Sequence, residues 1–218
     1  MTGTHSAPAE HLAAVQRLAL AYAPRAARLE TWAVLALDMR LAGIVRSRRE
    51  PIMAQLRLAW WRDTLRQPPE SWPRGEPILD ALSDWGDPGR LATLPEGWEA
   101  LLAEELSPDV IAEYAESRGR AYGSLADELG AGEVEDATAA GRLWALADLA
   151  ANLSEGAERK LVVEYARAQP PPPRLPAALR PLTVLAGLAR RAIGRRGAPL
   201  LDGPGAALLA MRLGIAGR

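Results

Sequence analysis

The sequence predicts an all-α protein built as a multi-helix bundle. Alanine, leucine, arginine and glutamate dominate the chain, and these residues are strong helix formers. Alternating β-branched runs are absent, and the nearest, LVVEYA at 161–166, lies in a helical context. Hydrophobic residues make up 49% and charged residues 24% of the 218, a balance typical of a globular domain that buries a substantial core.

Turn and capping residues divide the chain into separate helices. Pro51 can open a helix, because its missing N–H costs nothing at the first position. Ser107 supplies an N-cap before Pro108, and Gly130 and Gly156 suit left-handed positions after helices. The expected helices cover 9–21, 26–48, 52–66, 76–84, 96–106, 108–129, 134–154, 157–168, 177–194 and 204–215.

One domain accounts for this length. We expect a helical core over 1–168, an extended proline-rich connection, QPPPPRLP, at 169–176, and C-terminal helices over 177–218 that pack on the same domain.

Two of the helices carry unusual apolar patterns. The helix at 26–48 has apolar side chains on all sides, which is typical of a core helix surrounded by others. The helix at 52–66 has two apolar faces, and neighbouring residues of a helix point about 100° apart, so Trp60 and Trp61 serve different neighbours. Asp63 falls among the apolar residues of the first face and must be paired or line a cavity. The first face comprises Ile52, Met53, Leu56 and Trp60, and the second comprises Leu58, Trp61 and Leu65.

Composition excludes several kinds of chemistry. The absence of cysteine excludes disulfides and thiol catalysis, and both histidines, His5 and His11, lie near the N-terminus, where chain ends are usually solvated. A formal net charge of −1 gives no overall basic field for nucleic acid. No apolar run approaches the ~20 residues that span a bilayer, and no signal peptide is seen at the N-terminus, so we expect a cytoplasmic protein.

Three segments resemble the squalene/phytoene synthase family. They are LDMRLAGIVRSRREPIMAQLRLAWWRDTL (37–65), YAESRGRAYGSLADELG (114–130) and GRLWALADLAANLSEG (141–156). The resemblance implies a helical bundle of the isoprenoid (terpenoid) synthase type. The first segment is similar, more narrowly, to a divergent branch that includes a mitochondrial complex I assembly factor with a phytoene-synthase-like domain.

The resemblance also implies a chemistry that can be checked residue by residue. Active members hold Mg²⁺ through two acidic motifs on facing helices, because departing diphosphate needs charge compensation from hard cations with oxygen ligands. Here the slot of the first motif falls on Ala42, Gly43 and Arg46. In the second motif, Asn152 takes an aspartate slot, Glu155 matches, and a glycine replaces the final acid. The chain therefore lacks the carboxylates to collect magnesium, and we expect no metal site.

Two sets of residues remain candidates for a site. The cavity-lining candidates are Asp38, Arg40, Asp63, Tyr114, Asn152 and Glu155, and the anion-binding candidates are Arg46, Arg49 and Arg57. Each has a structural alternative. Asp63 can pair with Arg66, Asp38 and Arg40 can be buried ion-paired residues with different partners, Tyr114 can be a core residue, and the others can be solvated near helix ends. The arginines of LARRAIGRR at 188–196 spread around the helix, which favours a solvated helix end over a membrane anchor.

These observations favour a protein that binds and does not catalyse. The ligand would be a protein partner during assembly of a respiratory complex, or an apolar isoprenoid or lipid, with no cofactor, no nucleic acid and at most peripheral membrane contact. One alternative is an active prenyltransferase that uses Mg²⁺ to condense two prenyl diphosphates head to head. Another is a helical scaffold with no ligand.

Overall fold

The computed structural model describes residues 12–46, 51–132, 134–171 and 174–217. Over these residues the chain forms ten α-helices and no strand, which confirms the all-α prediction. The helices are α1 (Ala14–Leu20), α2 (Arg28–Arg46), α3 (Pro51–Leu65), α4 (Pro77–Leu82), α5 (Thr93–Ala100), α6 (Pro108–Glu128), α7 (Val134–Asn152), α8 (Gly156–Arg167), α9 (Arg180–Gly194) and α10 (Pro204–Ala216).

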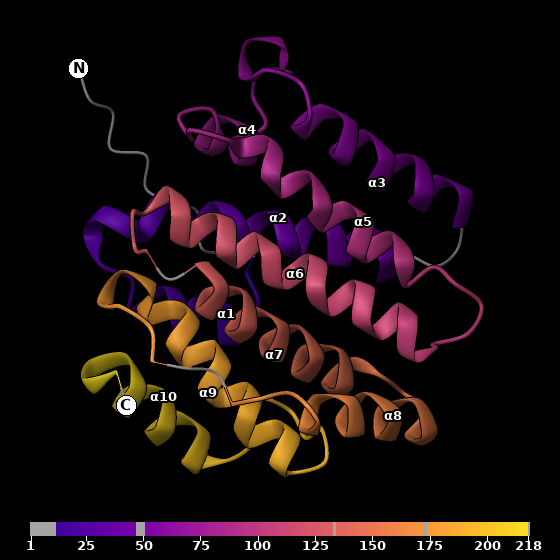
Figure 1. Cartoon of the computed structure of the whole chain (residues 1–218), viewed down its shortest axis with the longest axis vertical. Coiled ribbons are helices and arrows are strands. Elements are labelled where there is room, and N and C mark those ends of the chain that lie inside the picture. The colour runs from indigo at the N-terminus through magenta and orange to yellow at the C-terminus, as the bar shows by residue number, and fades with distance from the viewer. Residues whose placement is uncertain (1–11, 47–50, 133, 172–173, 218) are drawn as a thin grey trace.

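The helices pack in a simple spatial order. From one edge of the molecule to the other, α3, α5, α6, α7, α9 and α10 each contact the next, and α2 packs against α3, α5 and α6 (Figure 1). The pair α6 and α7 makes the most extensive helix contact. The helices α3 and α10 therefore lie at opposite edges of the bundle, where each has neighbours on one side alone.

Glycines allow α6 and α7 to approach closely. A Cβ atom added at Gly119 would lie 2.7 Å from the carbonyl oxygen of Thr138, and one added at Gly141 would lie 3.1 Å from the Cα of Gly119. Real Cβ atoms do not tolerate the first of these distances. The close contact between these two central helices thus depends on small residues at the crossing.

The helix α2 is the core helix that the sequence predicts. Trp32, Val34, Leu35, Leu37, Leu41, Ile44 and Val45 are all buried, and Leu29 is half-buried. The acidic residue Asp38 is buried among them, 2% exposed. A charged residue at this depth needs compensating partners.

Local signals place most helix ends correctly. Pro51 begins α3, the Ser107 hydroxyl accepts a hydrogen bond from the Val110 amide at 3.3 Å, and Gly130 has a φ of +60° after α6. Gly156 does not end a helix as expected but begins α8. The side-chain amide of Asn152 donates to the Asp148 carbonyl at 2.8 Å, so the end of α7 is capped without a left-handed glycine.

The helix α3 departs from the expectation of two covered faces. Leu58, Trp61 and Leu65 are buried, but the first face is open: Ile52 is 72%, Leu56 58% and Trp60 45% exposed. The indole of Trp60 meets that of Trp61 edge-on, and nearly half of the residue stays exposed. The two tryptophans have different surroundings, as predicted, but Trp61 packs in the core while Trp60 borders solvent, because α3 lies at the edge of the bundle. None of the described helices is long and apolar enough to cross a membrane.

Candidate functional site

A buried ion cluster joins α2, α6 and α7. Arg118 on α6 is 1% exposed, and its guanidinium donates to the Asp38 carboxylate of α2 at 2.5 Å and to the Asp148 carboxylate of α7 at 2.9 Å. It also donates to the Tyr114 hydroxyl at 2.5 Å. The indole N–H of Trp98 on α5 donates to the second Asp38 oxygen at 2.9 Å. One arginine of α6 therefore holds a carboxylate from each of two other helices, α2 and α7.

Aromatic rings surround this arginine. The carbon at the centre of its guanidinium lies 5.2 Å from the ring centre of Trp98, 5.3 Å from that of Tyr114 and 5.6 Å from that of Trp144. Trp98 and Tyr114 also meet edge-on, with ring centres 5.1 Å apart. All three rings are at least nine-tenths buried. A cation over an aromatic face is attracted by the ring quadrupole. The three rings also fill the space between α2, α5, α6 and α7.

Burial and charge act in opposite directions within the cluster. Burial raises the pKa of the Asp38 carboxyl above its usual value, and the nearby Arg118 guanidinium opposes that rise. For Arg118 itself, burial disfavours the charged form, but Asp38, Tyr114 and Asp148 together raise its pKa well above the usual value. The guanidinium therefore stays charged, and the cluster contains a permanent internal cation.

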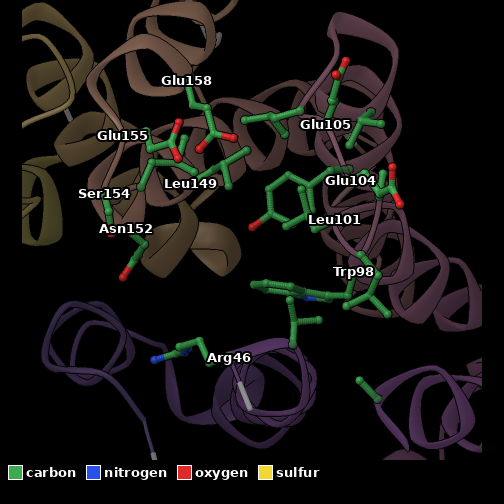
Figure 2. Close-up of a pocket in the computed structure, with 18 of the residues that line it drawn as sticks. Arg46, Trp98, Leu101, Glu104, Glu105, Leu149, Asn152, Ser154, Glu155 and Glu158 are labelled. Atoms are coloured by element: carbon green, nitrogen blue, oxygen red, sulfur yellow. The ribbon is translucent and has the colours of Figure 1, made fainter. Parts of the chain in front are cut away.

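A cavity of about 690 Å³ opens where several helices end, next to this cluster. The end of α2, the start of α3, the α5–α6 connection and the α7–α8 connection surround it (Figure 2). Its apolar lining includes Trp98, Leu101 and Leu149, and Tyr114 and Asp148 connect it with the ion cluster. The volume lies within the usual range for small-ligand sites.

The rim of the cavity is acidic. Glu155 and Glu158 lie on one side and Glu104 and Glu105 on the other, with Arg46 as the basic side chain of the lining (Figure 2). No group of three or more histidine, aspartate and glutamate residues in the described chain is placed to hold a metal ion. The glutamates are thus distributed around the opening and do not converge on one point.

The structure brings together part of the predicted site. Tyr114, Asn152 and Glu155, from three separate places in the sequence, all line the cavity, and so does Arg46. Tyr114 is also a buried core residue, which was its structural alternative. Asn152 is the last residue of α7, and Glu155 immediately precedes α8.

Three predicted cavity residues lie elsewhere. Asp38 is enclosed by Trp98 and Arg118 and does not reach the cavity, because its oxygens are taken by those donors. Arg40 is exposed and pairs with Glu76 at 3.1 Å. Since residues two apart on a helix point in different directions, the expectation of different partners for these two is confirmed.

The side chain of Asp63 is 59% exposed and pairs with Arg62 at 3.1 Å, and it lines no cavity because the face of α3 to which it belongs is open to solvent. Its expected partner Arg66 pairs instead with Glu96. Arg57 is exposed and outside the cavity lining, and Arg49 lies outside the described residues.

Two central residues of the cluster, Arg118 and Asp148, were not predicted from the sequence. Each has a signal that could have identified it. Arg118 follows Tyr114 by four residues, so both lie on one face of α6. Asp148 is the acidic residue within LWALADLAA, an otherwise apolar stretch of α7. A lone charge in such a stretch demands a buried partner, but the sequence does not identify that partner.

The residues present fit magnesium poorly. Mg²⁺ requires oxygen ligands in near-octahedral geometry, and the Asp38 and Asp148 carboxylates are already bonded to Arg118. A divalent ion there would have to displace a buried guanidinium, which also repels it. At the α2 positions where the resemblance to squalene/phytoene synthases implies acidic residues, this chain has Ala42, Gly43 and Arg46.

Comparison with known proteins supports the fold class. The family model for squalene/phytoene synthase matches residues 16–102, a stretch that runs from α1 to just past α5. The chain is squalene/phytoene synthase-like over these residues, and its all-α fold is of the isoprenoid synthase type. The match does not reach α6 and α7, which carry Arg118 and Asp148. No curated protein and no solved structure matches the chain.

Proposed function

We propose that this squalene/phytoene synthase-like protein does not transfer prenyl groups and acts by binding a protein partner. The observation that carries the proposal is the guanidinium of Arg118 between the carboxylates of Asp38 and Asp148. Ionisation of a prenyl diphosphate needs cations that bridge the leaving diphosphate, and those cations need carboxylates at the active site. An arginine fixed inside the bundle neutralises these carboxylates and lies too deep to contact a diphosphate.

Described side chains also occupy the region between the central helices, where an apolar substrate would have to lie. Trp98, Tyr114, Arg118 and Trp144 fill the region between the central helices, and all are buried. The cavity beside the ion cluster lies at the helix ends, and its rim carries four glutamates. Carboxylates at the opening disfavour both a diphosphate and an uncharged isoprenoid chain. A protein partner is therefore better supported than a bound lipid.

The open face of α3 is the surface that supports a partner protein. Ile52, Met53, Leu56 and Trp60 form a contiguous apolar stripe at 40–72% exposure, which a bundle helix would normally bury. Pro51 and Ala54 of the same helix line the acidic cavity, so apolar and acidic surfaces adjoin. We therefore expect a partner segment whose apolar side chains cover α3 and whose basic side chains reach the glutamates.

The assembly role rests on the location of this stripe. It lies within 37–65, the segment that resembles the complex I assembly factor branch. A subunit or intermediate of a respiratory complex is accordingly the partner we propose.

Catalysis is tested directly. Purified protein is incubated with farnesyl or geranylgeranyl diphosphate and Mg²⁺, and released pyrophosphate is measured. We expect no turnover above a heat-denatured control. Pyrophosphate release that disappears in Glu155→Ala would instead support the second candidate function, a prenyltransferase that uses the carboxylates around the cavity.

Partner binding is tested by capture of purified respiratory-complex subunits. Leu56→Glu places a charge in the middle of the open face, whereas Gln55→Glu places the same charge at an exposed polar position of the same helix. We expect Leu56→Glu to weaken capture at least about tenfold, as loss of a central apolar contact does, and Gln55→Glu to retain it. Equal capture by the two variants would exclude α3 as the interface, and no capture of any subunit would contradict the assembly role.

A further inference from the structure

The C-terminal part of the chain carries a charge of opposite sign to the rest. Residues 174–218 contain eight arginines and one aspartate, although the whole chain has a formal net charge of −1. This segment contains no phenylalanine, tyrosine or tryptophan. Such an asymmetry indicates a surface for an anionic partner.

The fold gathers four of these arginines around one cavity. Arg174 precedes α9, Arg190 and Arg191 lie on α9, and Arg212 lies on α10, and all four line a cavity of about 560 Å³ between the two helices. No acidic residue lines this cavity, and its remaining lining is mainly apolar, with Leu209 among it. The arginines that spread around the α9 helix in the sequence are thus brought together with arginines from outside it.

These guanidiniums keep most of their hydrogen-bonding capacity. None of the four forms an ion pair with a carboxylate of the described residues. One nitrogen of Arg191 donates to the Asp202 carbonyl at 2.9 Å, while its other terminal nitrogen is buried without a hydrogen-bond partner. The carboxylate of Asp202 pairs with Arg195, which lies outside the cavity lining. The cavity therefore presents donors that an anion can satisfy.

An exposed apolar stripe lies beside the cavity. Leu208, Met211 and Ile215 recur at helical spacing on α10 and are 62%, 47% and 73% exposed. Arg212 belongs to the same helix, next to Met211, and lines the cavity. The helix α10 lies at the edge of the bundle (Figure 1), and the stripe is open to solvent there.

We infer that this surface docks on a membrane that contains anionic phospholipid. Lipid phosphates enter the arginine-lined cavity, and Leu208, Met211 and Ile215 insert among the acyl chains. Guanidinium groups bind phosphate oxygens in pairs of parallel hydrogen bonds, and an interfacial helix needs an apolar face beside basic residues. Single-stranded nucleic acid fits less well, because its bases stack on aromatic rings, which this segment lacks, and the apolar stripe would stay uncovered.

The test is cosedimentation of the full chain with vesicles. One vesicle contains phosphatidylcholine alone, and the other contains phosphatidylcholine mixed with phosphatidylserine. We expect binding to the mixed vesicles, weakened by salt, and little binding to the neutral ones. Equal binding to both, or binding to neither, overturns the inference.

Matched variants separate the contribution of the arginines from that of the apolar stripe. Arg190→Gln with Arg212→Gln should weaken binding to the mixed vesicles about 25-fold, since each basic residue near such a surface contributes about fivefold. Arg25→Gln with Arg74→Gln removes the same charge at exposed positions outside the cavity and should change binding little.

Ile215→Ser should weaken binding about tenfold through loss of apolar insertion. If the Arg25→Gln with Arg74→Gln control loses as much vesicle binding as Arg190→Gln with Arg212→Gln, the cavity is not the binding site. Tight binding of inorganic phosphate without vesicle binding assigns the cavity to a soluble anion and overturns the membrane inference. The outcome is independent of the proposed function, because neither α3 nor the ion cluster takes part.

Discussion

Replacement of Arg118 by methionine is the most informative perturbation of this protein. Methionine retains much of the apolar bulk of the arginine stem but removes its charge and its donors. Asp38, with a side chain 4% exposed, would then be a buried carboxylate whose remaining donor is the indole of Trp98. Asp148 would lose the same partner, but its side chain is 23% exposed and water can replace the bond.

The expected loss in the free energy of unfolding follows from the different exposure of the two carboxylates. Breaking a buried pair by removing one partner costs roughly 3–5 kcal/mol, because an uncompensated charge stays behind. Asp148→Asn removes a partly solvated partner and should cost about 1 kcal/mol. In the double variant Arg118→Met with Asp38→Asn, the fully buried charge is removed, the Asp148 carboxylate that remains is partly solvated, and an acceptor for Trp98 is retained. Its stability should return to within about 2 kcal/mol of the wild type.

Urea unfolding followed by circular dichroism gives the free energy of unfolding of each variant. The loss expected for Arg118→Met is comparable with the whole stability of many domains, so this variant can fail to fold. In that case the double variant provides the measurement. The reasoning is refuted if Arg118→Met costs no more than Asp148→Asn. It is refuted equally if the double variant is less stable than Arg118→Met.

Two further predictions concern α6. Burial raises the pKa of Tyr114 and Tyr122 above the ordinary 10.0, so these phenols contribute stability that is present below that pH and is lost as the pH rises above it. Tyrosinate absorbance from both should appear together with the loss of circular dichroism in an alkaline titration, and absorbance that precedes unfolding in full would contradict this. Gly119→Ala should destabilise by about 1–3 kcal/mol, because the added Cβ would lie 2.7 Å from the Thr138 carbonyl oxygen. Gly43→Ala, with nothing within 4 Å, should be neutral or stabilising by about 1 kcal/mol in the same unfolding assay, and equal effects would show that α6 and α7 do not pack as closely as described.

The helices were predictable because their signals are local. Helix-forming residues, Pro51 at a first position, Ser107 at an N-cap and Gly130 after a helix all act within a few residues of themselves. The helix at 96–106 was the least accurate, since α5 begins at Thr93 and ends at Ala100. Pro95 is the third residue of α5, where the first turn tolerates a proline, so the helix begins before it.

Burial of α2 was predictable as well, and so was the need of Asp38 for a partner. Apolar residues on every side of a helix leave few arrangements except a central one, and a carboxylate there cannot remain alone. The sequence did not show which cation pairs with Asp38, because Arg118 is 80 residues away along the chain. Contacts at that separation depend on how α2 and α6 pack, and no local pattern records it.

The amino-acid sequence by itself determined that this protein is a helical bundle, that its first acidic motif is missing and that Asp38 and Arg40 on α2 need different partners. The tertiary structure alone decided that Arg118 joins two helices, that one apolar face of α3 stays open, and that Arg190 and Arg212 share a cavity. The physical reason is the same in each case. Helix formation depends on neighbours in sequence, whereas burial and charge pairing depend on neighbours in space.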